Sequence, residues 1–336
     1  MESLSPLTEA IAIPLVISVP AYLRDHHIDG LVVLSAVEAL QIVARSRPDG
    51  LDGYSGRQER AFFHHPLVID PRTTEIPAVH EHARYADGRC LSRLTTLRSG
   101  RQMKFTRRME HLSVWFAPAD RESARLEAGR EASCEMGDGA GNETGHPPDP
   151  ARARRGLSES EDKSRFETDS PSDLDDAIPH AGPTFRVSAD RLYDELVPFG
   201  PAYRNVRGDV FLTETCVSAT VSGGDFPEAA GPLGSPFPLD AAMHVACAWG
   251  QRYRNRVVFP VGFNRREILS PTRTGETYIC RITPLPDEGA VLCFDVRLQD
   301  LHRRPVEMIQ GLKMRDIFGG KRIPPAWVRE GLSGCA

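Results

Sequence analysis

The run LDAAMHVACAWGQRY, from Leu239 to Tyr253, decides the fold class of this chain. Apolar side chains occur on most sides of the helix that this run predicts, so the helix must be surrounded by other parts of the protein. A shorter run, AVEALQIVAR from Ala36 to Arg45, places Val37, Leu40 and Val43 on one helical face. Each run therefore predicts one central helix in its half of the chain.

Alternating apolar and polar residues predict strands around both helices. In the first half a strand precedes the helix and an antiparallel meander follows it. The strands expected there are Ile11–Val19, Ala61–Ile69, Ala78–Tyr85, Cys90–Arg98 and Phe105–Phe116. The second half approximately repeats this order, with a polar helix at Ser188–Val197 and strands at Asp209–Ser222, Val257–Val261, Glu267–Ser270, Thr277–Thr283, Val291–Leu298 and Val306–Met314. Each half is thus expected to be an α+β unit in which a curved antiparallel sheet wraps one helix.

The segment between the two halves has the composition of a linker. It consists mainly of Asp, Glu, Arg, Ser, Gly and Pro, and a segment with so few large apolar residues cannot offset the entropy that it loses on ordering. We therefore expect an N-terminal unit at residues 1–118, a disordered linker at 119–183, a C-terminal unit at 184–322 and a tail at 323–336.

The bulk composition indicates a chain that folds in water. Hydrophobic residues make up 40% of the 336 positions and charged residues 26%, close to the average of globular domains. The 41 basic and 46 acidic residues are mixed along the chain, which argues against a nucleic-acid-binding surface. No apolar run is long enough to cross a bilayer, and the seven scattered cysteines suit a reducing compartment, so we expect a cytoplasmic protein.

A histidine beside a glycine-containing loop is the first candidate for chemistry. His26 stands at the exit of a predicted strand, Gly30 follows four residues later, and the loop leads through Ser35 into the first helix. Histidine is the side chain best suited to remove a proton near neutral pH, and glycine lets the backbone pass close to a substrate. His27 competes for this role, because only the spacing to Gly30 favours His26. A single loop histidine is more often structural than functional.

An aspartate in the first turn of the second helix is the next candidate. Asp240 lies there, and His244 follows one turn later on the same face. An aspartate in a first turn is favoured by the helix dipole and can simply cap the helix. Burial among apolar side chains nevertheless favours the neutral, proton-donating form of a carboxyl. A third segment, Phe199-Gly200-Pro201-Ala202-Tyr203, is by itself a turn with aromatic flanks.

Together these segments resemble the dehydratase domains of polyketide synthases and the related dehydratases of polyunsaturated fatty acid synthases. That family has the motifs H-x-x-x-G-x-x-x-x-P, Y-G-P-x-F and D-x-x-x-Q or D-x-x-x-H. This chain has His26-x-x-x-Gly30, the Phe199–Tyr203 segment and Asp240-x-x-x-His244 in the same order. Two positions depart from the pattern. Ser35 replaces the last proline of the first motif, so the resemblance does not define the shape of the loop beside His26. Phe199 replaces the tyrosine of the second motif. The resemblance covers both halves but not the linker, and it implies a double hot dog fold.

The resemblance implies a dehydratase that eliminates water from a 3-hydroxyacyl thioester and gives a 2-enoyl thioester in polyketide or fatty acid synthesis. His26 would be the base at C2 and Asp240 the acid toward the C3 hydroxyl. A backbone N–H between Val33 and Ala36 could donate to the enolate oxygen. The residues expected to contact the substrate or shape its site are His244, Gly30, Phe199, Gly200, Pro201, Tyr203 and Ser35.

The implied partner is an acyl carrier protein, which would deliver the thioester on its phosphopantetheine arm, with a ketosynthase or other synthase components beside it. No metal and no bound cofactor are expected, and both a monomer and a homodimer fit a double hot dog. Five arginines are candidates for contact with an acidic carrier or a phosphate, although an ordinary solvated face explains them equally well: Arg252, Arg254, Arg256, Arg265 and Arg266.

Two other kinds of function are compatible with the same sequence. A thioesterase or a product-template cyclase would use the same fold and also arrange a histidine and an aspartate near an acyl thioester. A catalytically silent double hot dog would only bind acyl carrier protein or act as a scaffold.

Overall fold

The computed structural model describes residues 5–48, 54–99, 106–118 and 183–330. All of these residues belong to one unit, formed by residues 1–119 and 180–336. The expected linker at residues 119–183 lies outside the described residues, apart from Pro183.

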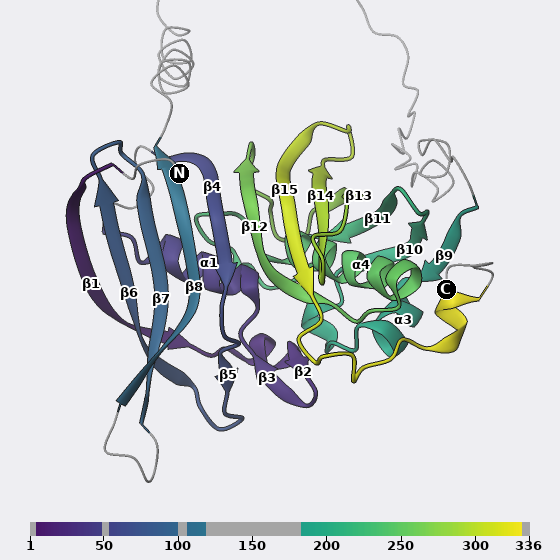
Figure 1. The fold of residues 1–336 in the computed structure, drawn as a ribbon, viewed down its shortest axis with the longest axis horizontal. Coiled ribbons are helices and arrows are strands. Elements are labelled where there is room, and N and C mark those ends of the chain that lie inside the picture. Colours follow the sequence, from purple (N-terminus) through teal and green to yellow (C-terminus); the bar gives the residue numbers. More distant parts are fainter. Residues whose placement is uncertain (1–4, 49–53, 100–105, 119–182, 331–336) are drawn as a thin grey trace, which may run out of the picture. The chain divides into compact units, whose positions relative to one another are not determined.

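The N-terminal half consists of helix α1 (Ala36–Arg45) and five strands of a large sheet (Figure 1). Ser35 begins the helix, because its side chain accepts a hydrogen bond from the Glu38 amide at 3.3 Å. Val37, Leu40 and Val43 are buried, as their helical spacing predicts. The strands lie in the order β1 (Leu7–Ser18), β6 (Glu75–Tyr85), β7 (Cys90–Ser99), β8 (Thr106–Pro118) and β4 (Tyr54–Phe63).

The C-terminal half is built in the same way around helix α4 (Phe237–Arg254), which is buried along nearly its whole length. Asn255, in the left-handed conformation, ends this helix. Its strands continue the sheet in the order β12 (Phe259–Ile268), β15 (Pro305–Arg315), β14 (Val291–Gln299), β13 (Thr277–Pro284), β11 (Val217–Ser222), β10 (Val206–Leu212) and β9 (Phe185–Ser188). The prediction of one helix wrapped by an antiparallel sheet in each half is confirmed.

The two halves join where β4 pairs antiparallel with β12, so that a single 12-stranded sheet runs through the unit. A buried ion pair lies at this junction: Arg266 on β12 contacts Glu307 on β15 at 2.8 Å. Arg266 also donates to the side-chain oxygen of Gln58 on β4 at 3.1 Å. The junction is therefore a continuous part of the core, and it fixes how the two helices face each other.

Several elements differ from the sequence-based expectations. The strand expected at Ala61–Ile69 is divided between the end of β4 and a short strand, β5 (Val68–Ile69). The two strands expected at Val257–Val261 and Glu267–Ser270 are one strand, β12, whose register shifts next to Gly262. A side chain at Gly262 would meet the Ala61 carbonyl oxygen at 2.2 Å, so the glycine permits the close approach of β4 instead of ending the strand. The helix expected at Ser188–Val197 is divided into a short α-helix, α3 (Ala189–Arg191), and a π-helical turn (Leu192–Leu196).

Residues 323–330, the described part of the expected tail, pack on the C-terminal half. A 3₁₀ helix covers Ala326–Arg329, and Val328 within it is buried. Arg252 of α4 donates to the Val328 carbonyl oxygen at 2.6 Å. Within the described ranges, no helix is both long enough and apolar enough to span a bilayer.

Candidate active site

A small hairpin sets the position of His26. The 3₁₀ helix η1 (Ala21–Asp25) ends at His26, and strands β2 (His27–Ile28) and β3 (Leu31–Val33) follow. Asp29 and Gly30 connect them with φ angles of 53° and 73°, the conformation of a type I′ turn. The hairpin returns Val33 to His26, and the Val33 amide donates to the His26 carbonyl oxygen at 2.9 Å.

The same contact fixes which nitrogen of the His26 ring is free to act as a base. Nδ1 lies 2.7 Å from the Val33 carbonyl oxygen, which can only accept, so Nδ1 carries the hydrogen and Nε2 keeps its lone pair. Burial lowers the pKa of His26, although the charge of Asp240 and the bond to Val33 oppose this effect. The ring is therefore neutral at pH 7.

The Phe199–Tyr203 segment packs behind His26. The Phe199 ring stacks on the His26 ring with centroids 4.5 Å apart. Asp25 holds the segment in place, because its carbonyl oxygen accepts from the Gly200 amide and its carboxylate accepts from the Ala202 amide, both at 2.8 Å. A side chain at Gly200 would come within 2.5 Å of the Asp25 carboxylate, so this position requires glycine.

Asp240 approaches the same space from α4. Its carboxylate is only 4% exposed, and Oδ2 lies 3.0 Å from Nε2 of His244 without the angle of a hydrogen bond. The Tyr193 hydroxyl accepts from the Val206 amide at 2.9 Å, so its own hydrogen is available for His244 Nδ1 at 3.4 Å. This arrangement assigns the ring hydrogen of His244 to Nε2, on the side of Asp240.

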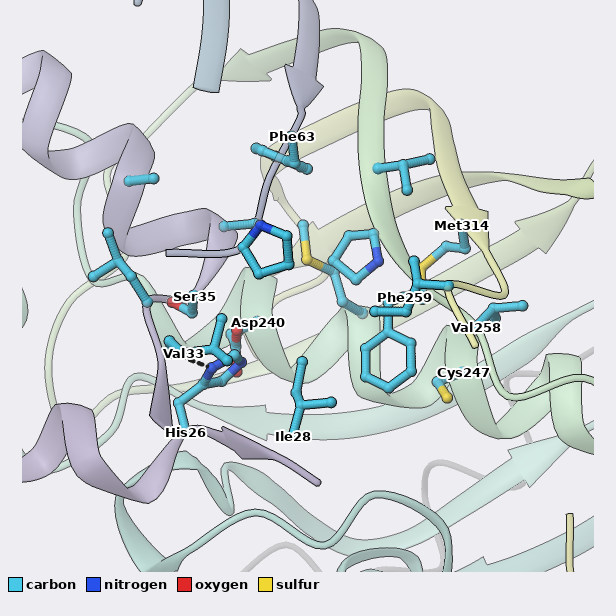
Figure 2. A pocket seen from close by; sticks show the side chains of 18 of the residues that line it. His26, Ile28, Val33, Ser35, Phe63, Asp240, Cys247, Val258, Phe259 and Met314 are labelled. Carbon is cyan, nitrogen blue, oxygen red and sulfur yellow. Dashed lines mark hydrogen bonds between the residues drawn. The ribbon is translucent and has the colours of Figure 1, made fainter. Parts of the chain in front are cut away.

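His26 and Asp240 line one cavity of about 140 Å³. Figure 2 shows the two side chains next to each other in this cavity, and the charge of Asp240 acts on the His26 ring. The remaining wall is largely apolar and includes Ile28, Phe63, Met243, Cys247, Val258, Phe259 and Met314. The cavity thus joins one imidazole from the N-terminal half and one carboxyl from the C-terminal half to a space suited to an acyl chain.

The residues predicted from the motifs fall into two groups. Ser35, Phe199 and His244 line the cavity together with His26 and Asp240. Gly30 instead forms the hairpin turn, and Gly200, Pro201 and Tyr203 support the wall behind His26 and Phe199. Of the two adjacent histidines, His26 lines the cavity, while Nδ1 of His27 lies 3.0 Å from the Asp25 carbonyl oxygen.

The arginine run expected to meet a carrier protein is divided by burial. Arg252 and Arg266 are buried and bonded within the core, so their prediction as carrier contacts is wrong. Arg254 and Arg265 form ion pairs with Asp287 and Glu267. The Arg256 guanidinium has a buried Nη1.

Several residues of the site carry no signal in the sequence. Val33 acts through its carbonyl oxygen, which any residue could supply, and Tyr193 belongs to a segment without a motif. The amides of Val33 and Leu34 already donate to His26 and Leu67, which leaves the amides at Ser35 and Ala36, at the start of α1, as candidate donors to a substrate oxygen. The described residues contain no group of three or more His, Cys, Asp or Glu that could hold a metal ion.

The fold is similar to that of solved dehydratase domains of polyketide synthases. The dehydratase domain of a mycocerosic acid synthase-like polyketide synthase aligns with a TM-score of 0.60 and 16% identity, over 92% of this chain and 95% of its own. The dehydratase domain of RzxB from Pseudomonas fluorescens aligns with a TM-score of 0.58 and 15% identity, over 90% and 94%. An N-terminal dehydratase from the difficidin assembly line aligns with a TM-score of 0.60 and 12% identity, over 91% and 93%.

No protein-family model and no curated protein matches the sequence of this chain. The structural similarity extends over nearly the whole of each compared chain, so this protein has the double hot dog fold of those domains. The fold class predicted from the sequence is confirmed.

Proposed function

We propose that this protein eliminates water from a 3-hydroxyacyl thioester to give a 2-enoyl thioester. The observation that carries the proposal is the meeting of His26 and Asp240, from opposite halves of the chain, in one largely apolar cavity. Elimination of water requires a base at C2 and an acid at the C3 oxygen, and a neutral imidazole and a buried carboxyl supply these two groups.

The reaction follows from the positions of these groups. Nε2 of His26 takes the C2 proton, and the electrons of that bond move toward the thioester oxygen as an enolate. The enolate then collapses to form the C2–C3 double bond as the C3–O bond breaks. Asp240 gives its proton to the departing hydroxyl, which leaves as water. His244 lies beside the Asp240 carboxyl, with its Nε2 3.0 Å from Oδ2. The amides at Ser35 and Ala36 receive the thioester oxygen while negative charge develops on it.

The thioester is expected on the phosphopantetheine arm of an acyl carrier protein in polyketide or fatty acid synthesis, in the cytoplasm, with a ketosynthase or other synthase components as further partners. The exposed residues of the cavity wall, among them His64, His65 and Arg315, mark the side from which the arm would enter. Arg315 is therefore our candidate for contact with the phosphate, in place of the buried Arg252 and Arg266. The protein's own residues supply the acid and the base, so the proposal needs no cofactor.

The direct test is the product formed from a 3-hydroxyacyl thioester of a pantetheine analogue. A dehydratase gives a 2-enoyl thioester with conjugated absorbance, and His26→Ala and Asp240→Asn should each slow its formation by about 10²–10⁴-fold. In D₂O, Asp240→Asn should still exchange the C2 hydrogen for deuterium, because His26 remains, whereas His26→Ala should not.

The outcomes also separate the alternative functions. Release of the free acid would identify a thioesterase, and a cyclised product would identify a cyclase. Binding of acyl carrier protein without any turnover would identify a silent scaffold. Full turnover by both variants would exclude the roles assigned to His26 and Asp240.

A further inference from the structure

The two halves of the sheet have the same strand order, counted outward from the junction of β4 with β12. The order is β4-β8-β7-β6-β1 in the N-terminal half and β12-β15-β14-β13-β11 in the C-terminal half, so β1 and β11 occupy equivalent places. After each of these strands comes a 3₁₀ helix, which is η1 in one half and η5 (Pro227–Ala229) in the other. A short antiparallel pairing follows, either β2 with β3 or the bridge between Gly231 and Gly234. The path of the chain into α1 is thus repeated before α4.

Glu38 on α1 is the counterpart of Asp240 on α4. Both carboxyls lie in the first turn of their helix, and both residues are buried, with exposed fractions of 3% and 4%. Asp240 and His244, one turn apart on the same face, line the candidate active site. Glu38 and Ile42 have the same spacing on α1, and they line a second cavity of about 580 Å³. The second cavity is therefore related to α1 as the candidate active site is related to α4.

The second cavity lacks a counterpart of the imidazole base. His26 is the residue directly after η1, and Ala230 is the residue directly after η5. The two positions match in their backbone, because each amide donates to the carbonyl oxygen three residues earlier. Arg45 of α1 binds this part of the chain instead, through the Ala229 and Ala230 carbonyl oxygens at 2.8 Å and 2.7 Å. None of the described residues that line the second cavity is a histidine.

The second cavity does have a buried carboxyl and an apolar wall. The Tyr22 hydroxyl donates to Oε1 of Glu38 at 3.1 Å, and a carboxylate can accept further hydrogen bonds. Ser18, Thr74 and Glu228 also line the cavity but are exposed, so they form its rim, whereas Glu38 lies at its inner end. The volume is typical of a small-molecule site. The apolar wall consists of Leu15, Ile17, Val19, Leu23, Leu34 and Ile42.

These features define a class of ligand. The apolar wall suits an alkyl chain, and the buried carboxyl requires a hydrogen-bond donor on that chain. In the mechanism proposed above, the equivalent carboxyl of Asp240 meets the C3 hydroxyl of the substrate. A 3-hydroxyacyl chain would present the same two groups, an alkyl chain and a hydroxyl, to the second cavity.

We propose that the second cavity binds a 3-hydroxyacyl chain without dehydrating it, and that the 3-hydroxyl donates to Glu38. This inference rests on the proposed function, which supplies the class of ligand. The protein thus has two sites for an acyl chain, one beside each central helix, and converts only the chain beside α4.

The first test is the number of ligand molecules that bind to each chain. Calorimetric titration with 3-hydroxyoctanoyl-pantetheine uses protein with His26→Ala and Asp240→Asn combined, which leaves the ligand unconverted. Two molecules should bind. Ile42→Trp, which fills the second cavity, should remove one of them, and the matched change Ile28→Trp in the candidate active site (Figure 2) should remove the other. A single bound molecule that Ile42→Trp leaves in place would overturn the inference.

Ile42→Trp also needs a control for folding. In the otherwise unchanged protein this variant should still dehydrate the substrate, because Ile42 does not line the candidate active site. Retained turnover shows that the loss of one bound molecule comes from the filled cavity.

The second test is the recognition of the hydroxyl by Glu38, measured in Ile28→Trp protein at about pH 8, above the pKa of about 7 to which burial raises Glu38. 3-Hydroxyoctanoyl-pantetheine should bind about tenfold more tightly than octanoyl-pantetheine, as expected for one hydrogen bond to a carboxylate. Glu38→Leu should abolish this preference. Tyr22→Phe is the matched control and should retain it, because the Glu38 carboxyl remains. A preference that Glu38→Leu leaves unchanged, or tighter binding of octylamine, would overturn the inference.

These measurements separate the inference from the proposed function. Dehydration by the wild type together with only one bound molecule would refute the inference alone. Binding with a preference that depends on Glu38, in a protein that forms no enoyl thioester, would refute the proposed function alone.

Discussion

The ring of His26 stacks on the ring of Phe199, with centroids 4.5 Å apart and an angle of 17° between their planes. This contact joins the base of the N-terminal half to a segment of the C-terminal half. Phe199 stands where the family motif has tyrosine, so the ring that covers His26 is purely apolar. The contact therefore helps to exclude water from His26 as well as to hold it in place.

Phe199→Ala should move the acid limb of kcat/KM to higher pH. The apolar ring contributes to the burial that lowers the pKa of His26, so its loss brings that pKa back toward the ordinary value of 6.5. His26 must be neutral to act, so activity would be lost at a higher pH as the solution is acidified. The measurement is kcat/KM as a function of pH, with Phe199→Leu as the control that keeps most of the burial. A limb that moves to lower pH would show that the ring does not have this effect.

The lowered pKa of His26 also makes the stability of the fold depend on pH. A histidine with a lowered folded-state pKa binds its proton more readily when unfolded, so its contribution to stability is complete above about pH 6.5 and is lost as the pH falls. Chemical denaturation at several pH values should therefore show a smaller acid-induced loss of stability in His26→Gln than in the wild type. An equal loss in both proteins would mean that other groups cause it.

Gly30 should prove to be a turn residue and not a substrate contact. Its φ of 73° favours glycine or asparagine, and a side chain there would meet nothing within 4 Å. Gly30→Val should cost about 1–3 kcal/mol of stability through backbone strain, and Gly30→Asn clearly less, with KM unchanged. Denaturant unfolding and steady-state kinetics measure the two effects. A raised KM in a stable Gly30→Asn protein would restore the substrate-binding role expected from the motif.

The buried ion pair at the junction of the halves should matter more than the exposed pair beside it. Glu307→Ala leaves Arg266 charged and buried, which typically costs about 3–5 kcal/mol. Glu267→Ala, on the same strand as Arg266, removes the partner of the partly exposed Arg265 and should cost at most about 1 kcal/mol. Denaturant unfolding measures the free energy of unfolding of both variants. Similar losses in the two would contradict the prediction that the buried pair matters more than the exposed one.

Much of the fold follows from periodicity in the sequence. Helix α1 has the bounds that its apolar spacing predicts, and α4 extends the expected helix by only a few residues. The break expected in β12 is absent, because Gly262 instead allows strand β4 to approach closely. This contact joins residues that are far apart in the chain, so the local sequence does not predict it. The helix expected at Ser188–Val197 is broken into shorter turns, and Tyr193 in this segment reaches His244.

The site was less predictable than the fold. His26 and Asp240 were found through motif order, because neither has a distinctive local pattern. Their meeting depends on the pairing of β4 with β12, which joins strands far apart in the chain. Glu38 follows Ser35 with the spacing of a capping box, so its sequence position indicates helix capping.

The central claim is that His26 and Asp240 act on one substrate as a unit. The most direct measurement is a double-mutant cycle on kcat/KM for dehydration of a 3-hydroxyacyl thioester, with His26→Ala, Asp240→Asn and the two combined. The account predicts that each single change lowers the rate by about 10²–10⁴-fold and that the double variant is hardly slower than the worse single one. Losses that multiply in the double variant, or a wild-type rate in either single variant, would contradict it.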